Sequence, residues 1–170
     1  MRTSSRTAST GSRRPQNSAL GTGLRLLGGR AHSRVEIQRK LARRGYTEEE
    51  VDAALVRLEE LGYLNDLAFA EGLVRVRSSS RGPRALSAEL AKRGVSRTQA
   101  DQALAPYDEA LQLASAARII ERTYGKRQIT DYREMLERAG NKLVRLGFST
   151  TIVRGACRAV VSGTSANAEA

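Results

Sequence analysis

Basic residues are the side chains that this sequence offers for chemistry with a partner. Several of them gather in short clusters, either just before a glycine or around a break in the chain. Guanidinium and ammonium groups bind phosphates and carboxylates, so these clusters predict contacts with an anionic partner. The candidate residues for binding a partner or a nucleic acid are Arg39, Lys40, Arg43, Arg44, Arg75, Arg77, Arg81, Arg84, Lys92, Arg93, Lys142 and Arg145.

The clusters before each glycine also have a purely structural interpretation. Cations stabilise the C-terminal end of a helix, where the last carbonyl groups carry partial negative charge. Glu89 precedes Arg93 by four residues, which is the spacing of an ordinary surface ion pair on a helix. The segment from Arg75 to Arg84 is different, because it holds four arginines and no carboxylate. We expect this segment to line an anion-facing surface.

The charge of the whole chain supports an acidic partner. The 170 residues include 29 Lys and Arg against 18 Asp and Glu, a net charge of +11. Nucleic acid, an acidic protein surface or an anionic membrane would suit this charge, although it also serves solubility alone. Residues 1–18 are rich in Arg, Ser, Thr and Gly, and we predict a disordered basic arm there, with an organelle transit peptide as the alternative.

Few residues could support catalysis, a cofactor or a metal ion. His32 is the only histidine and Cys157 the only cysteine, and no phosphate-binding glycine loop is present. We expect Cys157 to be a buried core thiol. The run Glu48 to Glu50 suits the positive end of a helix dipole better than a metal. We therefore predict a protein that is not an enzyme and has no cofactor, no metal site and no catalytic residue.

One short stretch recurs three times and organises the chain. In each copy, a leucine and mostly basic residues lead to a glycine, then an apolar residue, then Ser or Thr. Such recurrence predicts one structural unit used three times. The copies are KLARRGYT at Lys40–Thr47, ELAKRGVS at Glu89–Ser96 and KLVRLGFS at Lys142–Ser149.

The recurring stretch has the features of a tight turn between two helices. A glycine after a helix adopts the left-handed conformation that ends helices. Thr47 and Glu50 then form a capping box for the next helix, and Ser96 and Gln99 do the same in the second copy. The third copy has Ile152 in place of Glu or Gln, so its capping box is incomplete.

Helical periodicity dominates the chain, and strand-like alternation is almost absent. The fold class is therefore all-α, with three-helix repeats at about 19–63, 64–106 and 107–161 and a disordered tail at 162–170. The glycines of its first helix weaken that helix. No apolar run reaches the roughly 20 residues that span a bilayer. The predicted helices are 19–30, 33–44, 47–61, 66–79, 84–93, 96–105, 108–124, 130–146 and 149–161.

A sequence-specific helix-turn-helix DNA regulator is one alternative function. Such proteins place the start of the second helix against base edges. In the first unit these residues are Glu48 to Glu50, whose charge would oppose phosphates. The second unit offers Arg97, Gln99 and Gln102, which could hydrogen-bond to bases.

Three segments resemble the RecX family of regulatory proteins. The stretch LEELGYLNDLAFAEGLVRVR resembles the family motif L-x-x-x-G-Y-L-[DN]-D-x-x-F-A, although Leu67 and Ala68 stand where relatives often carry charge. The resemblance covers about Leu20 to Val161. The three segments are Leu58–Arg77, Arg25–Tyr46 and Leu143–Ser149.

The resemblance implies both a fold and a function. It implies an elongated protein of three tandem three-helix repeats, with no catalytic residues. It further implies binding to RecA and to the RecA–single-stranded DNA filament, with inhibition of ATPase, strand-exchange and coprotease activities, and hence control of recombinational repair and the SOS response. We expect a cytoplasmic monomer with weak, non-specific DNA binding and no membrane contact.

Overall fold

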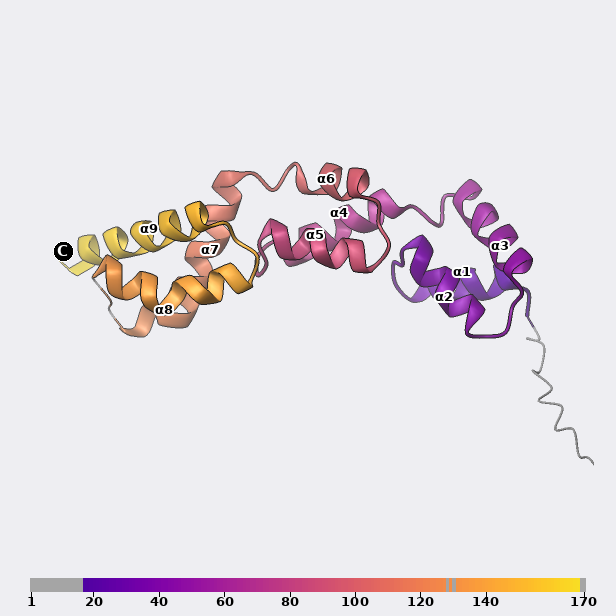
Figure 1. Ribbon diagram of the computed structural model, residues 1–170, viewed down its shortest axis with the longest axis horizontal. Helices are drawn as coiled ribbons and strands as arrows, with labels where there is room; N and C mark the ends of the chain where they lie inside the picture. Colours follow the sequence, from indigo (N-terminus) through magenta and orange to yellow (C-terminus); the bar gives the residue numbers. More distant parts are fainter. Residues whose placement is uncertain (1–16, 128, 130, 169–170) are drawn as a thin grey trace, which may run out of the picture. The chain divides into compact units, whose positions relative to one another are not determined.

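The computed structural model describes residues 17–127, 129 and 131–168 of the chain (Figure 1). Within them the fold is all-helical, as predicted, with no strand. A short 3-10 turn, Gly125–Arg127, follows the seventh helix. The helices are α1 (Ala19–Gly29), α2 (Arg34–Ala42), α3 (Glu48–Glu60), α4 (Asp66–Arg77), α5 (Pro83–Lys92), α6 (Arg97–Leu104), α7 (Glu109–Tyr124), α8 (Tyr132–Arg145) and α9 (Thr150–Ala168).

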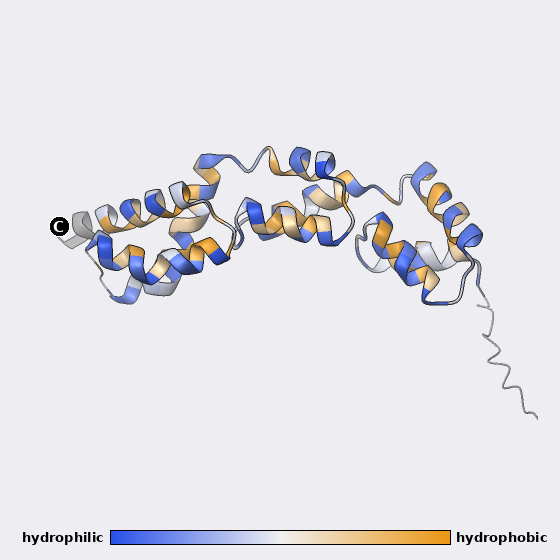
Figure 2. Cartoon of the chain, viewed as in Figure 1, coloured by the Kyte–Doolittle hydropathy of each residue, from blue (hydrophilic) through white to orange (hydrophobic). Residues whose placement is uncertain are grey.

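The chain divides into two compact units, one ending at Asn65 and the other beginning at Asp66. The first unit contains α1, α2 and α3, which all pack against one another. In the second unit, α4 and α5 pack on α6, while α7 and α8 pack on α9. Figure 2 shows hydrophobic positions interleaved with hydrophilic ones along the helices, the pattern of amphipathic helices. The predicted arm lies almost wholly outside the described residues.

Helix α1 forms despite its glycines, and one of them explains its position. A Cβ atom added at Gly23 would lie 2.7 Å from Cδ1 of Leu58, so the missing side chain lets α1 approach α3 closely. Tyr46 also fastens α1, because its hydroxyl donates to the carbonyl of Asn17 at 2.6 Å and lies 2.8 Å from the Thr22 hydroxyl. Packing therefore offsets the low helix propensity of this segment.

The recurring turn has the predicted geometry in all three places. Gly45, Gly94 and Gly147 have φ angles of 86°, 84° and 94°. The apolar residue that follows each glycine is buried. Both capping boxes are complete, at Thr47 and at Ser96, as predicted. Ser149 accepts one hydrogen bond from the backbone N–H of Ile152 at 3.3 Å, without the reciprocal bond. Whether the third group of helices is a repeat of the same kind stays a prediction.

A close backbone contact joins the two halves of the second unit. The Gly82 N–H donates to the carbonyl of Leu146 at 2.8 Å, and the Arg84 N–H donates to the carbonyl of Gly147 at 3.2 Å. A Cβ atom on Gly82 would collide with backbone atoms of Gly147 and Phe148. One hydrophobic core then extends through α4 to α9.

Two features of the chain differ from the sequence prediction. A disordered tail from Ser162 is wrong as far as Ala168, because α9 continues to that residue. No proline follows Val161 to stop the helix. Gly62, with φ 73°, ends α3 in the same way as the other turn glycines, although it lies outside the recurring stretch.

His32 is buried in the first unit among charged groups. Its Nδ1 lies 2.9 Å from Oε2 of Glu36, and its Nε2 lies 3.5 Å from Nζ of Lys40. Burial lowers the pKa of His32, and the positive charges of Arg30 and Lys40 lower it further, against the opposing effect of Glu36. The folded protein therefore keeps this imidazole neutral at neutral pH.

We expect Gly82→Ala to lower the free energy of unfolding by about 1–3 kcal/mol, the usual cost of forcing a group into close packing. Urea denaturation of the full chain, followed by circular dichroism, measures this change. Gly140→Ala is the matched control, because its Cβ would lie 3.5 Å from Cδ1 of Leu136. Because alanine favours the helix more than glycine does, Gly140→Ala should raise the free energy of unfolding by about 0.5–1 kcal/mol. Equal urea midpoints for Gly82→Ala and the wild type would contradict the close contact between Gly82 and Gly147.

A second prediction concerns pH. Because the pKa of His32 is lower in the folded chain than its ordinary value of 6.5, the unfolded chain binds a proton first as the pH falls. The free energy of unfolding should therefore fall as the pH is lowered from 7 to 5.5. Urea titrations at several pH values measure this slope. His32→Gln should flatten it over that interval, and an unchanged slope in the variant would show that other groups cause it.

Candidate anion-binding surface

The basic cluster of the first unit has two kinds of member. Arg44 donates through Nη1 to the carbonyl of Lys40 at 3.0 Å, and Lys40 itself lies beside His32. These contacts agree with the structural interpretation, in which cations stabilise the end of α2. Arg39 and Arg43 are exposed and remain candidates for contact with a partner.

Two arginines of the second unit are tied to one carboxylate. Glu89 on α5 accepts from Nη2 of Arg93 at 2.9 Å, which is the predicted pair, and lies 3.7 Å from Nη1 of Arg77 on α4. The Arg93 guanidinium also lies 5.8 Å from the centre of the Phe69 ring. Arg77 and Arg93 therefore connect helices, and their charge is partly compensated.

Four other predicted residues of the second unit are exposed. They differ from the pair at Glu89, because no carboxylate among the described residues lies within ion-pair distance of them. Their positive charge is available to an anion from outside. These residues are Arg75, Arg81, Arg84 and Lys92.

The backbone contact between the halves of the second unit brings two predicted clusters together. Arg81 precedes Gly82, and Arg145 precedes Leu146, the residues joined by the 2.8 Å hydrogen bond. Arg84 is itself joined to the opposite loop through its backbone N–H. All three arginine side chains are exposed. We call Arg81, Arg84 and Arg145 the junction arginines; such a group suits successive phosphates or carboxylates.

Lys142 lies one helical turn before Arg145 on α8 and contacts α7. Its Nζ donates to Oγ1 of Thr123 at 3.1 Å and lies 5.9 Å from the centre of the Tyr124 ring. Lys142 and Arg145 line an open hollow of about 490 Å³ beside α7, together with Arg138. Lys142 is thus anchored to α7, while Arg145 is shared between the hollow and the junction.

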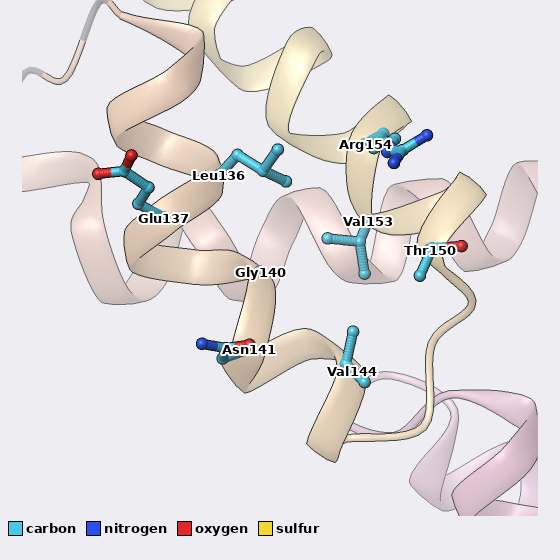
Figure 3. A pocket seen from close by; sticks show the side chains of 8 residues that line it. All are labelled: Leu136, Glu137, Gly140, Asn141, Val144, Thr150, Val153 and Arg154. Carbon is cyan, nitrogen blue, oxygen red and sulfur yellow. The ribbon is translucent and has the colours of Figure 1, made fainter.

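A separate groove between α8 and α9 was not predicted. It has a volume of about 320 Å³, and Figure 3 shows Glu137 and Arg154 on its opposite edges. Val144 lines it and is 46% exposed. Gly140, which has no side chain, lies among the residues of its wall. The sequence pattern did not indicate this groove, because helical periodicity alone does not distinguish the lining of a groove from a core.

The remaining candidates have structural roles. Cys157 is completely buried, as predicted, and burial raises the pKa of its thiol. Glu48, Glu49 and Glu50 occupy the first turn of α3, and hydrogen bonds from the backbone of Glu49 and the side chain of Thr47 lower the pKa of Glu49. The described part of the chain contains no cluster of three metal-ligating side chains. None of its helices is both long and apolar enough for a bilayer.

Comparisons with known proteins identify two domains. A family model described as the first three-helix domain of RecX matches residues 19–58. The model of the second three-helix domain of RecX matches residues 65–104. These boundaries agree with the helices α1–α3 and α4–α6.

Two bacterial relatives match most of the chain. Regulatory protein RecX of Stenotrophomonas maltophilia is 35% identical over 145 residues, which are 85% of each chain. Regulatory protein RecX of Mycolicibacterium vanbaalenii is 34% identical over 137 residues, covering 76% of this chain and 74% of the relative. The crystal structure of RecX from Lactobacillus salivarius has the same fold, with a TM-score of 0.76 and 24% identity over 84% of this chain and 94% of that chain.

Two variants of equal charge distinguish free arginines from compensated ones. We expect Arg81→Gln/Arg145→Gln to elute from a heparin column at clearly lower salt than the wild type. Arg77→Gln/Arg93→Gln should elute closer to the wild type but lose about 0.5–1 kcal/mol of stability, the scale of partly exposed ion pairs. Salt at elution and the urea midpoint measure the two effects. If both variants eluted together, the junction would have no special role in anion binding.

Proposed function

We propose, because the chain belongs to the RecX family of regulatory proteins, that it binds RecA and the RecA–single-stranded DNA filament. Bound there, it inhibits the ATPase, strand-exchange and coprotease activities of RecA. It thereby restrains recombinational repair and the SOS response, in the cytoplasm. The observation that carries the proposal is the family relationship over most of the chain.

The charged surface supports this proposal physically. A RecA filament on DNA presents phosphates together with protein carboxylates, and the chain has a net charge of +11. The junction arginines are exposed, and the Gly82–Leu146 hydrogen bond holds their two segments together. Preorganised cations bind an anionic surface with less loss of conformational entropy than scattered ones. The protein would act by contact alone, without a catalytic group.

A helix-turn-helix regulator that acts without RecA is less well supported. The start of α3 carries carboxylates, which repel phosphates. At the start of α6, Gln99 accepts from the Ser96 hydroxyl at 2.8 Å, and Arg97 lies 3.8 Å from a carboxylate oxygen of Asp101. The Gln99 side chain, which would have to hydrogen-bond to a base edge, is therefore already engaged in capping α6, and Arg97 faces a carboxylate of the same helix.

The test is ATP hydrolysis by RecA from the same organism on single-stranded DNA, with this protein titrated in. We expect inhibition at substoichiometric amounts. Arg81→Glu/Arg145→Glu should need roughly tenfold more protein, since losing one charge-assisted hydrogen bond costs about 1.5 kcal/mol or more. Arg118→Glu/Arg133→Glu is the matched control, because both residues are exposed and outside the junction.

Unchanged hydrolysis with folded wild-type protein would refute the proposal. Sequence-selective binding to one duplex would then favour the helix-turn-helix alternative. Equal inhibition by the junction variant and the control would leave the RecA target in place and remove the junction arginines from the contact surface.

A further inference from the structure

A second groove lies in the second unit, between α4, α6 and the start of α7. Its volume is about 340 Å³. Val74, Ala103 and Tyr107 form its apolar floor and are buried. Leu111 and Pro106 also line it, and Leu111 is 53% exposed. The groove therefore presents apolar surface to the solvent through Leu111.

Hydrogen bonds hold the walls of this groove in place. The Tyr107 hydroxyl donates to the carbonyl of Ser78 at 2.8 Å and lies 3.2 Å from the carbonyl of Arg81. Gln112 donates through Nε2 to the carbonyl of Tyr107 at 2.8 Å. Asp108 caps α7 by accepting from the N–H of Leu111 at 2.8 Å. The aromatic ring and the leucine are thus positioned before any ligand arrives, which lowers the entropic cost of binding.

The polar groups at the groove fit a nucleotide. Glu71 and Arg75 lie one turn apart on α4, and both are exposed. In the described chain no ion pair joins either of them to an oppositely charged side chain. A carboxylate accepts hydrogen bonds from the exocyclic amino groups of bases, while a guanidinium binds phosphate oxygens. Ser78 lines the same wall, and its backbone N–H and carbonyl are already bonded to Val74 and Tyr107.

The groove also adjoins the anion-binding surface. The Tyr107 hydroxyl contacts the carbonyl of Arg81, which is one of the junction arginines. A ligand with one flat apolar face in the groove can therefore place negative charge toward Arg75 or Arg81. Proteins that bind single strands combine these two elements, a cationic track and an aromatic or apolar platform for bases.

We infer that this groove binds an unstacked base of a single-stranded nucleic acid, with the adjoining phosphates on Arg75 and Arg81. The inference rests on the proposed function, in which the protein works on filaments that contain single-stranded DNA, and it names the ligand of one particular groove. The apolar floor contacts the ring of the base. Glu71 favours bases with an amino group, such as cytosine, over thymine.

Anisotropy of labelled oligonucleotides tests the inference with no RecA present. The three probes are a deoxycytidine strand, a thymidine strand and an abasic phosphodiester of the same length and charge. We expect the wild type to bind the cytidine strand about 5–10-fold more tightly than the abasic strand, the scale of one base contact with an aromatic platform. Leu111→Ser should reduce this ratio toward one. Val144→Ser, of similar exposure in the α8–α9 groove, is the matched control and should keep it.

Glu71→Gln provides a second measurement. It should narrow the preference for cytidine over thymidine while leaving the affinity for the abasic strand unchanged or higher. Equal binding of base-bearing and abasic strands by the wild type would overturn the inference, as would a failure to bind any single strand. A variant at Leu111 that weakens RecA binding without DNA, but keeps the ratio, would assign the groove to a protein contact instead.

The outcome is separate from that of the RecA experiment. Inhibition of ATP hydrolysis can persist when the base-bearing and abasic strands bind equally, in which case only the groove assignment fails. Conversely, base-dependent binding without inhibition of ATP hydrolysis would support the assignment of the groove and refute the proposed action on RecA.

Discussion

The second unit depends on a close approach of two backbones. The loop at Gly82 and the turn at Gly147 meet through two hydrogen bonds, and neither position has room for a side chain. Because of this contact, helices α4 to α9 share one hydrophobic core. It also brings Arg81 and Arg145, which are remote in sequence, into adjoining segments. The proximity of the two segments that carry the junction arginines is thus a consequence of packing between small residues.

Charge compensation within the fold then sorts the basic residues. Glu89 forms ion pairs with Arg77 and Arg93, and a backbone carbonyl near the C-terminal end of α2 accepts a hydrogen bond from Arg44. The predicted residues that remain exposed without such a contact are Arg39, Arg43, Arg75, Arg81, Arg84, Lys92 and Arg145. Because compensated cations gain little from a new anion, this smaller set would dominate contacts with phosphates. The net charge of the chain alone does not indicate this distinction.

A regulator that works by contact needs shaped surface rather than reactive groups. The second unit combines the junction arginines with a groove that has Tyr107 in its floor and another groove lined by Val144. Charge and apolar surface lie close together there, which suits a target made of both protein and nucleic acid. The first unit has its own core and contributes a separate basic cluster at Arg39 and Arg43.

The sequence by itself determined the helices, most of their ends and the recurring turn. These depend on local rules: apolar spacing, capping residues such as Thr47 and Ser96, and a glycine at each helix end. It also predicted the family and the set of basic residues. Only the tertiary structure decided that Gly82 packs against Gly147, that Glu89 forms an ion pair with Arg77 as well as Arg93, and that apolar grooves remain open. Those outcomes depend on distances between residues on different helices, which helical periodicity does not specify.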